Sequence, residues 1–165
     1  MMIDPLPVIS INHVLGLCDV LDERGGREDV YKLARELNYK LGDLLLIIRA
    51  AEMLGLVTTP GGDIVLEPLG KQVAEGDTAS KKAVLRAQME RLTLFQYFLK
   101  LLGNSPEGEL DKDTILEELA ILMPNENPKT SFQNLVSWGR FADLFGYSRD
   151  TNQFFLQQKP EEHAE

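Results

Sequence analysis

The stretch RAAEMLGL at residues 49–56 has a near copy, RFADLFGY, at residues 140–147. Arg, Ala and Gly match outright, and Glu52 is exchanged for the similar Asp143. Each copy has the character of a helix end, with apolar residues, then a Gly that suits a left-handed stop, then the first residue of a strand. Two hypotheses follow: a small structural unit that occurs twice, or chance similarity between two amphipathic helix ends. The flanking sequence decides between them.

The residues around the first copy predict three helices and a β-hairpin. Apolar residues recur at helical spacing over 11–21, 30–37 and 43–54. LVTTPGGDIVLE at 56–67 contains two short β-prone runs around a Pro-Gly-Gly-Asp turn, which is the pattern of a hairpin. PLGKQVAEG at 68–76 then predicts a short helix, because its Pro stands at the first helical position.

The residues around the second copy predict the same order of elements. One long helix is expected over 78–102, and a second helix opens at Asp111 or Asp113. A third helix begins at an Asn-Pro cap and is expected to run to Phe145, with the following Gly as its stop. YSRDTNQFFL follows and contains two short β-prone runs, so a second hairpin is expected there.

The order helix, helix, helix, hairpin is that of a winged helix, a helix-turn-helix with an appended β-hairpin. The predicted fold class is therefore mainly α with small β-hairpins, in a tandem winged-helix arrangement. The predicted first unit is 1–76, and the second unit is 77–157 and begins with the long helix. Residues 158–165 are expected to form a polar tail.

Composition narrows the classes of function. The chain has 165 residues and a net charge of −9, which on average repels a phosphate backbone. Its single cysteine excludes an intramolecular disulfide. No apolar run approaches the roughly 20 residues that span a bilayer, and MMIDPLPVIS lacks the pattern of a signal peptide. We expect a soluble cytoplasmic protein without membrane insertion. The Met-Met start favours a free-standing protein, with an excised domain as the alternative.

The third helix of the first unit is predicted to contact protein. In winged helices that bind DNA, this helix enters the major groove and needs outward cationic and amide side chains. The outward face of the helix at 43–55 carries Leu46, Arg49 and Met53, with Glu52 beside them. The face and its flanks thus carry one cation, two carboxylates, since Asp43 lies on the other side, and several apolar groups. This composition suits packing against a protein, so Leu46, Arg49 and Met53 are predicted interaction residues.

The second unit has more cations in the corresponding elements, with Lys129 and Arg140 on the helix and Arg149 on the hairpin. They are not expected to gather on one face, as they would in a protein that reads DNA. Specific nucleic-acid binding is therefore disfavoured. Arg140 holds the position of Arg49 in the repeat, so it is expected to form a structural ion pair or to contact a partner.

The stretch LTLFQYFLKLL at 92–102 is apolar most of the way round a helix. Such a helix needs cover on several sides, because an exposed apolar patch of this size is rare on a monomer. Either both units cover it or a second copy of the chain does. We favour a homodimer, with Leu94, Phe95 and Phe98 as interaction residues.

No catalytic, cofactor-binding or metal-ligating residues are predicted. The phosphate-loop and dinucleotide-binding glycine patterns are absent. His13 and His163 are too few for a metal site without clustered carboxylates. Cys18 lies on an apolar helix stripe, so a buried thiol is favoured over a nucleophile. The aromatic residues around Trp138 are assigned to core packing rather than to a ligand cage. We therefore expect a chain that is not an enzyme.

The chain also resembles a known family. The phrases LDERGGREDVYKLA, AAEMLGLV, GDIVLEPLG and SWGRFADLFGYS are similar to the C-terminal AAA-associated domain over roughly residues 10–157. That domain follows the ATPase domain in some ABC-transporter ATP-binding subunits of the nitrate, sulfonate and bicarbonate uptake type. The resemblance implies a helical, winged-helix-like accessory module tied to transport ATPases, and it brings no functional residues. This sequence departs from the family in two respects. The ATPase domain that usually accompanies this domain is missing here, because the chain has no phosphate loop, and Glu67 stands where a hydroxyl residue is common.

Two functions remain open at this point. The first is a non-catalytic accessory or regulatory module that binds protein and is associated with an ABC-type transport ATPase. The alternative is a winged-helix DNA-binding transcription regulator, which rests on the fold alone and against which the charge argues.

Overall fold

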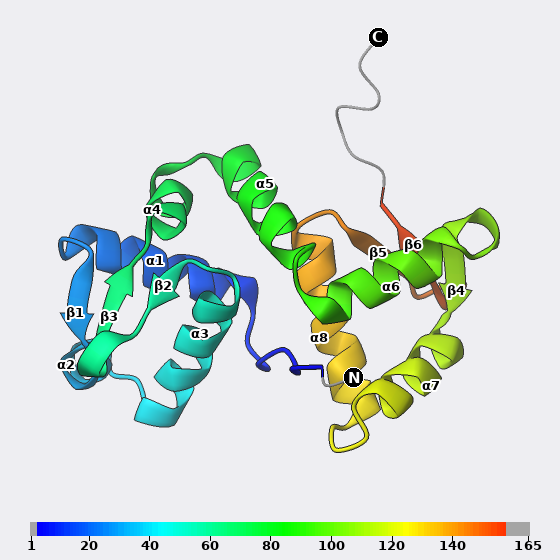
Figure 1. Cartoon of the computed structure of the whole chain (residues 1–165), viewed down its shortest axis with the longest axis horizontal. Helices are drawn as coiled ribbons and strands as arrows, with labels where there is room; N and C mark the ends of the chain where they lie inside the picture. The colour runs from blue at the N-terminus through cyan, green and yellow to red at the C-terminus, as the bar shows by residue number, and fades with distance from the viewer. Residues whose placement is uncertain (1–2, 158–165) are drawn as a thin grey trace, which may run out of the picture. The chain divides into compact units, whose positions relative to one another are not determined.

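The computed structural model describes residues 3–157, which are mainly helical with two small antiparallel sheets (Figure 1). The chain divides into two compact units. The N-terminal unit runs from Pro7 to Gln88, and the C-terminal unit contains the residues from Met89 onward together with those up to Leu6. Each unit has its own three-stranded sheet, so each is described by itself.

The N-terminal unit has five helices and one sheet, and two of its helices follow the hairpin. Its elements are α1 (Ile11–Glu23), β1 (Arg27–Asp29), α2 (Val30–Glu36), α3 (Leu41–Met53), β2 (Val57–Thr58), β3 (Asp63–Leu66), α4 (Pro68–Glu75) and α5 (Thr78–Met89). The strands are ordered β1-β3-β2, so β3 is central, and Ile64 in its middle is fully buried. The predicted hairpin and the short helix at 68–76 are confirmed.

Strand β1 is an element that the apolar pattern did not predict. Arg27–Asp29 is entirely polar, yet it pairs antiparallel with β3, with Glu28 opposite Ile64. Asp29 then caps α2, because its side chain accepts the backbone N–H of Lys32 at 2.9 Å. A capped helix directly after a paired strand fixes the direction in which α2 leaves the sheet.

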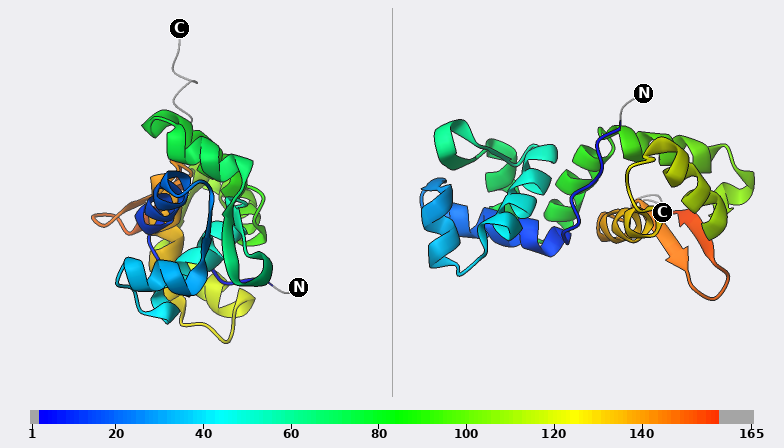
Figure 2. Two further views of the ribbon diagram at one scale, coloured as in Figure 1. Left: turned by 90° about the vertical axis from the view of Figure 1, so that its left-hand side faces the viewer. Right: turned by 90° about the horizontal axis from the view of Figure 1, so that it is seen from below.

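The C-terminal unit repeats the order of elements. It contains α6 (Thr93–Gly103), β4 (Glu109–Asp111), α7 (Lys112–Leu122), α8 (Pro128–Phe141), β5 (Phe145–Ser148) and β6 (Gln153–Leu156). Its sheet has the order β4-β6-β5, and the hairpin of β5 and β6 lies beside α8 (Figure 2). Asp111 caps α7 as Asp29 caps α2. Asn127 caps α8 ahead of Pro128, as the sequence predicts.

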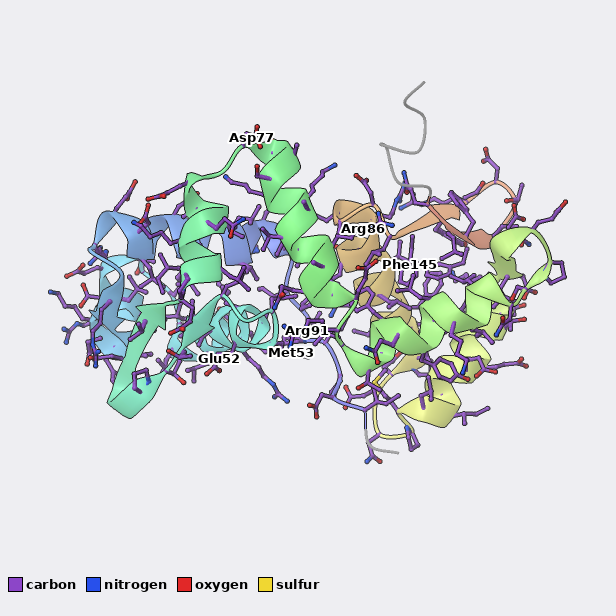
Figure 3. All side chains as sticks on the ribbon, turned by 45° about the horizontal axis from the view of Figure 1, so that its top comes forward. Glu52, Met53, Asp77, Arg86, Arg91 and Phe145 are labelled. Carbon is purple, nitrogen blue, oxygen red and sulfur yellow. The ribbon has the colours of Figure 1, made fainter. Side chains whose placement is uncertain are left out.

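Aromatic side chains form the core of the C-terminal unit. The Phe145 ring stacks on Phe95 with centroids 5.6 Å apart and lies 4.8 Å from the ring of Phe154 (Figure 3 labels Phe145). Trp138 is fully buried, and Phe132 packs against Phe154. The assignment of these rings to core packing is confirmed.

The predicted long helix over 78–102 is wrong, because the chain forms two helices there, α5 and α6. Leu92 between them has extended backbone angles and is the N-cap of α6. At 3.6 residues per turn, one continuous helix would place Leu85 and Met89 on the side opposite Phe98. All three residues are fully buried. The break between α5 and α6 allows the apolar side chains of each helix to be buried separately.

The third helix of the second unit ends earlier than predicted, at Phe141 rather than Phe145. Asp143 adopts the positive φ of 59° that Gly55 adopts, at 73°, after α3. The N–H of Leu144 bonds to the Gly139 carbonyl at 2.8 Å, as the N–H of Leu56 bonds to that of Ala51 at 3.0 Å. These matched bonds align the ends of the two third helices with a shift of 88 residues rather than 91.

This alignment corrects the interpretation of the repeat. With the shift of 88 residues, Arg140 corresponds to Glu52, so the predicted equivalence of Arg140 and Arg49 is wrong. Gly146 lies within β5, and a Cβ there would stand 2.3 Å from the Phe155 ring. The octapeptide match is therefore offset by three residues from the structural repeat, while the order of elements repeats.

Candidate functional site

A groove runs along α8 in the C-terminal unit, with a volume of about 500 Å³. It lies between the exposed face of α8, the start of α7 and the β5–β6 hairpin. Its lining contains four cations and no carboxylate, and consists of Lys112, Lys129, Phe132, Gln133, Val136, Ser137, Arg140, Tyr147 and Arg149.

The sequence of α8 separates a buried face from a polar one. Asn127 starts the helix by accepting the N–H groups of Lys129 and Thr130 at 2.9 and 3.3 Å. The inward side chains include a buried Asn134, whose amide donates a hydrogen bond to the Leu6 carbonyl at 3.2 Å. This bond holds the N-terminal segment around Leu6 against α8. The outward side chains are all exposed and polar: Lys129, Gln133, Ser137 and Arg140.

The far wall of the groove is held in place by contacts around one ring. Lys112 places its Nζ 5.4 Å from the centroid of Phe132, which is cation–π geometry. Tyr147 meets the same ring edge-on, with centroids 5.3 Å apart, and its hydroxyl donates to Asn152 Oδ1 at 2.7 Å. The N–H of Lys112 donates to the Asn152 carbonyl at 2.9 Å. The start of α7 and the hairpin are thus joined.

The groove collects most of the cations of its unit. Four of the six lysines and arginines between residues 89 and 157 line it. The expectation that the cations of the second unit do not gather is therefore wrong. Carboxylates adjoin them in sequence: Asp111 and Asp113 flank Lys112, and Asp150 follows Arg149. Asp111 is already engaged as the cap of α7.

The corresponding helix of the N-terminal unit has a different surface. On α3 the side chains of Leu45 and Leu46 are 48% and 40% exposed, and Arg49 is exposed as well. Met53 is half-buried at the end of the helix, next to Glu52 (Figure 3). Glu52 accepts a hydrogen bond from the Thr59 hydroxyl at 2.7 Å, so its carboxylate turns toward the hairpin. The outward face of α3 thus carries two exposed leucines and one cation, with the exposed carboxylates Asp43 and Glu52 beside them.

Comparison with known families gives one match. The sequence model of the C-terminal AAA-associated domain matches residues 31–148, which is more than half of the chain. The chain belongs to the family of C-terminal AAA-associated domains. Searches of curated proteins and of solved structures find no match. Membership is consistent with an accessory module of ABC-type ATPases.

Three of the predicted interaction residues of this AAA-associated domain are core residues. Leu94, Phe95 and Phe98 are buried in the folded chain, with exposed fractions of 2% or less. Their assignment to an intermolecular surface is therefore corrected, because a single chain already covers them. The prediction was wrong because it assumed one long helix. In the structure α6 is a separate helix that buries its own row of apolar side chains.

The cysteine and one of the two histidines of this AAA-associated domain lie within the residues that the structure describes. Cys18 is fully buried on α1, and its pKa is raised to about 12, first by burial and then by Asp19, with Lys81 opposing. The thiol is therefore protonated at neutral pH and is no nucleophile. His13 is exposed and its Nδ1 lies 2.9 Å from the Ser10 hydroxyl oxygen, while His163 lies outside the described residues.

Among residues 3–157, no group of three or more histidines, cysteines and carboxylates is placed to hold a metal ion. None of the helices in the same range has the length and apolar character needed to cross a membrane.

Proposed function

We propose that the chain is a non-catalytic accessory module that binds protein and regulates an ABC-type transport ATPase of the nitrate, sulfonate and bicarbonate uptake class in the cytoplasm. Family membership supports the association with an ATPase. The observation that carries the protein-binding part is the exposed apolar face of α3, with Leu45 and Leu46 nearly side by side. Fixed, exposed leucines on a rigid helix gain free energy when a partner covers them, about 1 kcal/mol each.

We also propose that both units are winged helices. Each has a helix, a strand, two helices and a hairpin in that order, with the single strand pairing to the second hairpin strand. Under this proposal the repeated elements are α1 to β3 and α6 to β6, and α3 and α8 are the equivalent third helices. The compact units divide between Gln88 and Met89, rather than between residues 76 and 77 as the sequence predicted. The common site on this architecture is then the outward face of the third helix, which is apolar in one unit and basic in the other.

The test is affinity capture of the tagged chain from its source organism, with identification of the retained proteins by mass spectrometry. An ABC-type ATP-binding subunit should be retained by the wild-type chain. Leu46→Asp should reduce its recovery at least about tenfold, because the charge would have to be buried in the interface. Ile121→Asp is the matched control, since Ile121 is 73% exposed on α7, which belongs to the other unit, and its change should leave recovery unaltered.

Two outcomes contradict the proposal. One is recovery of no transport ATPase by a folded chain. The other is equal loss of recovery in Leu46→Asp and Ile121→Asp, which would show that α3 is not the contact. A homodimer is the competing occupant of the α3 face. Light scattering that gives a dimer for the wild type and a monomer for Leu46→Asp would assign that face to a second copy.

DNA binding is the second candidate function, and one specific observation favours it, the cation-lined groove on α8. One sequence-based objection was that the cations of the second unit do not gather, and the groove removes it. The objection from the net charge of −9 remains.

A further inference from the structure

We propose that the groove along α8 is a docking surface for the phosphate backbone of duplex DNA. The four phosphate-contacting side chains are those of Lys112, Lys129, Arg140 and Arg149. This inference rests on the second candidate function, DNA binding, and is independent of the proposed protein-binding role, which depends on α3 in the other unit. The chain would then contact an ATPase with one unit and nucleic acid with the other.

The first argument is the chemistry of the α8 face. Four exposed positions along the helix carry Lys, Gln, Ser and Arg, all of which can donate hydrogen bonds to phosphates and base edges. From Lys129 to Arg140 this stripe extends about 16 Å, at 1.5 Å per residue. A major groove roughly 12 Å wide admits a helix with such a face.

The second argument concerns the placement of the other two cations. In winged helices that bind DNA, the hairpin reaches the backbone beside the groove that the third helix enters. Arg149 lies on the hairpin. Lys112 is joined to the same hairpin, because its backbone N–H donates a hydrogen bond to the Asn152 carbonyl. The two cations therefore flank the α8 stripe on the side where a phosphate strand would run.

A duplex fits the lining better than an acidic protein segment does. Stable protein interfaces have an apolar centre that both partners bury. Here the apolar side chains that line the groove offer little area, since Phe132 and Val136 are already buried, with 5% and 9% of their surface exposed. What remains exposed is charged or amide-bearing, as a phosphate backbone requires.

The net charge of −9 weakens the binding of DNA but does not change which surface of the chain binds it. At about 0.15 M salt, charges more than about 8 Å away are largely screened, so the groove acts through its own four cations. Asp113 and Asp150 adjoin two of them and weaken the local field. We therefore expect weak binding, with little sequence preference and a strong dependence on salt.

The experiment is fluorescence anisotropy of a labelled duplex of about 20 base pairs, titrated with the full chain at several salt concentrations. Four phosphate contacts give a slope of log K against log salt of about −3.6, or roughly 150-fold weaker binding between about 50 and 200 mM. Arg140→Ala and Lys129→Ala should each make the slope shallower by about one. Lys100→Ala, at an exposed cation on α6 outside the groove, should leave it unchanged.

Ser137→Glu provides a second route to the same conclusion. It places a negative charge at an exposed position in the centre of the groove, where it cannot disturb the core, and it should abolish measurable binding. Circular dichroism establishes that each variant is folded.

Three results would overturn the proposal. The first is no binding by the wild type at about 50 mM salt. The second is an equal effect of Lys100→Ala and Arg140→Ala. The third is displacement of the duplex by a polyglutamate peptide at far lower charge concentration than by unlabelled duplex, which would assign the groove to an acidic protein segment. None of these results bears on capture of the ATPase through α3.

Discussion

Replacement of Gly139 by alanine should destabilise the C-terminal unit. A Cβ at this position on α8 would stand 2.4 Å from Cδ2 of Phe145 and 3.1 Å from its Cβ. The second of these atoms is fixed to the backbone, so rotation of the ring leaves this tight contact in place. Phe145 is also held on two sides, by Phe95 at 5.6 Å and Phe154 at 4.8 Å between ring centroids.

The magnitude follows from two opposing effects. Overpacking of a well-filled core costs about 1–3 kcal/mol, and the aromatic neighbours of Phe145 place this case at the upper end. Alanine in place of glycine inside a helix returns about 1 kcal/mol through helix propensity. We expect a net loss of about 2 kcal/mol in the free energy of unfolding of this unit.

Denaturant unfolding followed by tryptophan fluorescence measures this loss. Trp138 is the only tryptophan, it is fully buried, and it lies in the C-terminal unit, so its emission reports that unit alone. Gly103→Ala is the control, because that helical glycine has no neighbour within 4 Å of an added Cβ and the change should be neutral or stabilising.

A second substitution tests whether the clash is the cause. The N-terminal unit has Ala51 and Val57 where the shift of 88 residues places Gly139 and Phe145. Phe145→Val should therefore relieve the clash, and the double variant should lose at least about 1 kcal/mol less than the sum of the single losses. If Gly139→Ala stabilises the unit, or if the two losses simply add, the packing argument is refuted.

Three other predictions concern single residues. The Cys18 thiol, whose pKa is raised to about 12 by burial, should not react with a thiol reagent at pH 8 until the chain unfolds, and rapid labelling of the native protein would contradict this. The hydrogen bonds that Thr114 donates hold the pKa of Asp111 below its ordinary value, so their stabilisation is present above the unfolded pKa of about 4 and is lost as pH falls through the folded value. The Tm of the C-terminal unit should then fall less between pH 7 and pH 3 in Asp111→Asn than in the wild type. An equal fall in both would show that ionisation of the Asp111 cap does not contribute to the pH dependence of stability. Phe98→Glu should unfold the C-terminal unit, because the side chain is fully buried, and a folded variant with altered oligomeric state would restore the predicted dimer surface.

The helices were largely predictable from local sequence, and the short strands were not. The spacing of apolar residues located α3 and α7, since their inward side chains repeat at helical period. Strands β1 and β4 consist of RED and ELD, which are mostly polar and too short to alternate. They exist because each pairs with a distant strand. A repeated Gly-x-x-Asp, at 26–29 and 108–111, is the local signal that could have located both.

The end of α8 was mispredicted because an aspartate, Asp143, adopts the positive φ that a glycine was expected to adopt. Asp143 takes a positive φ, which aspartate tolerates better than most residues. The groove was missed for a different reason. Lys112 and Arg149 are far apart in sequence. They line the same groove only because β4 pairs with β6. The apolar face of α3, by contrast, depends on one helix alone and followed from its sequence.

The matched caps and helix ends also show where the two copies differ in length. The cap residues Asp29 and Asp111 are 82 residues apart, whereas the helix stops Gly55 and Asp143 are 88 apart. The second copy therefore has six more residues between cap and stop, in the segment that supplies α7 and α8. Because each unit closes its own sheet and its own core, such an insertion reshapes one copy without disturbing the other. A chain built in this way can change the surface of one half by lengthening it, while the other half keeps its own surface.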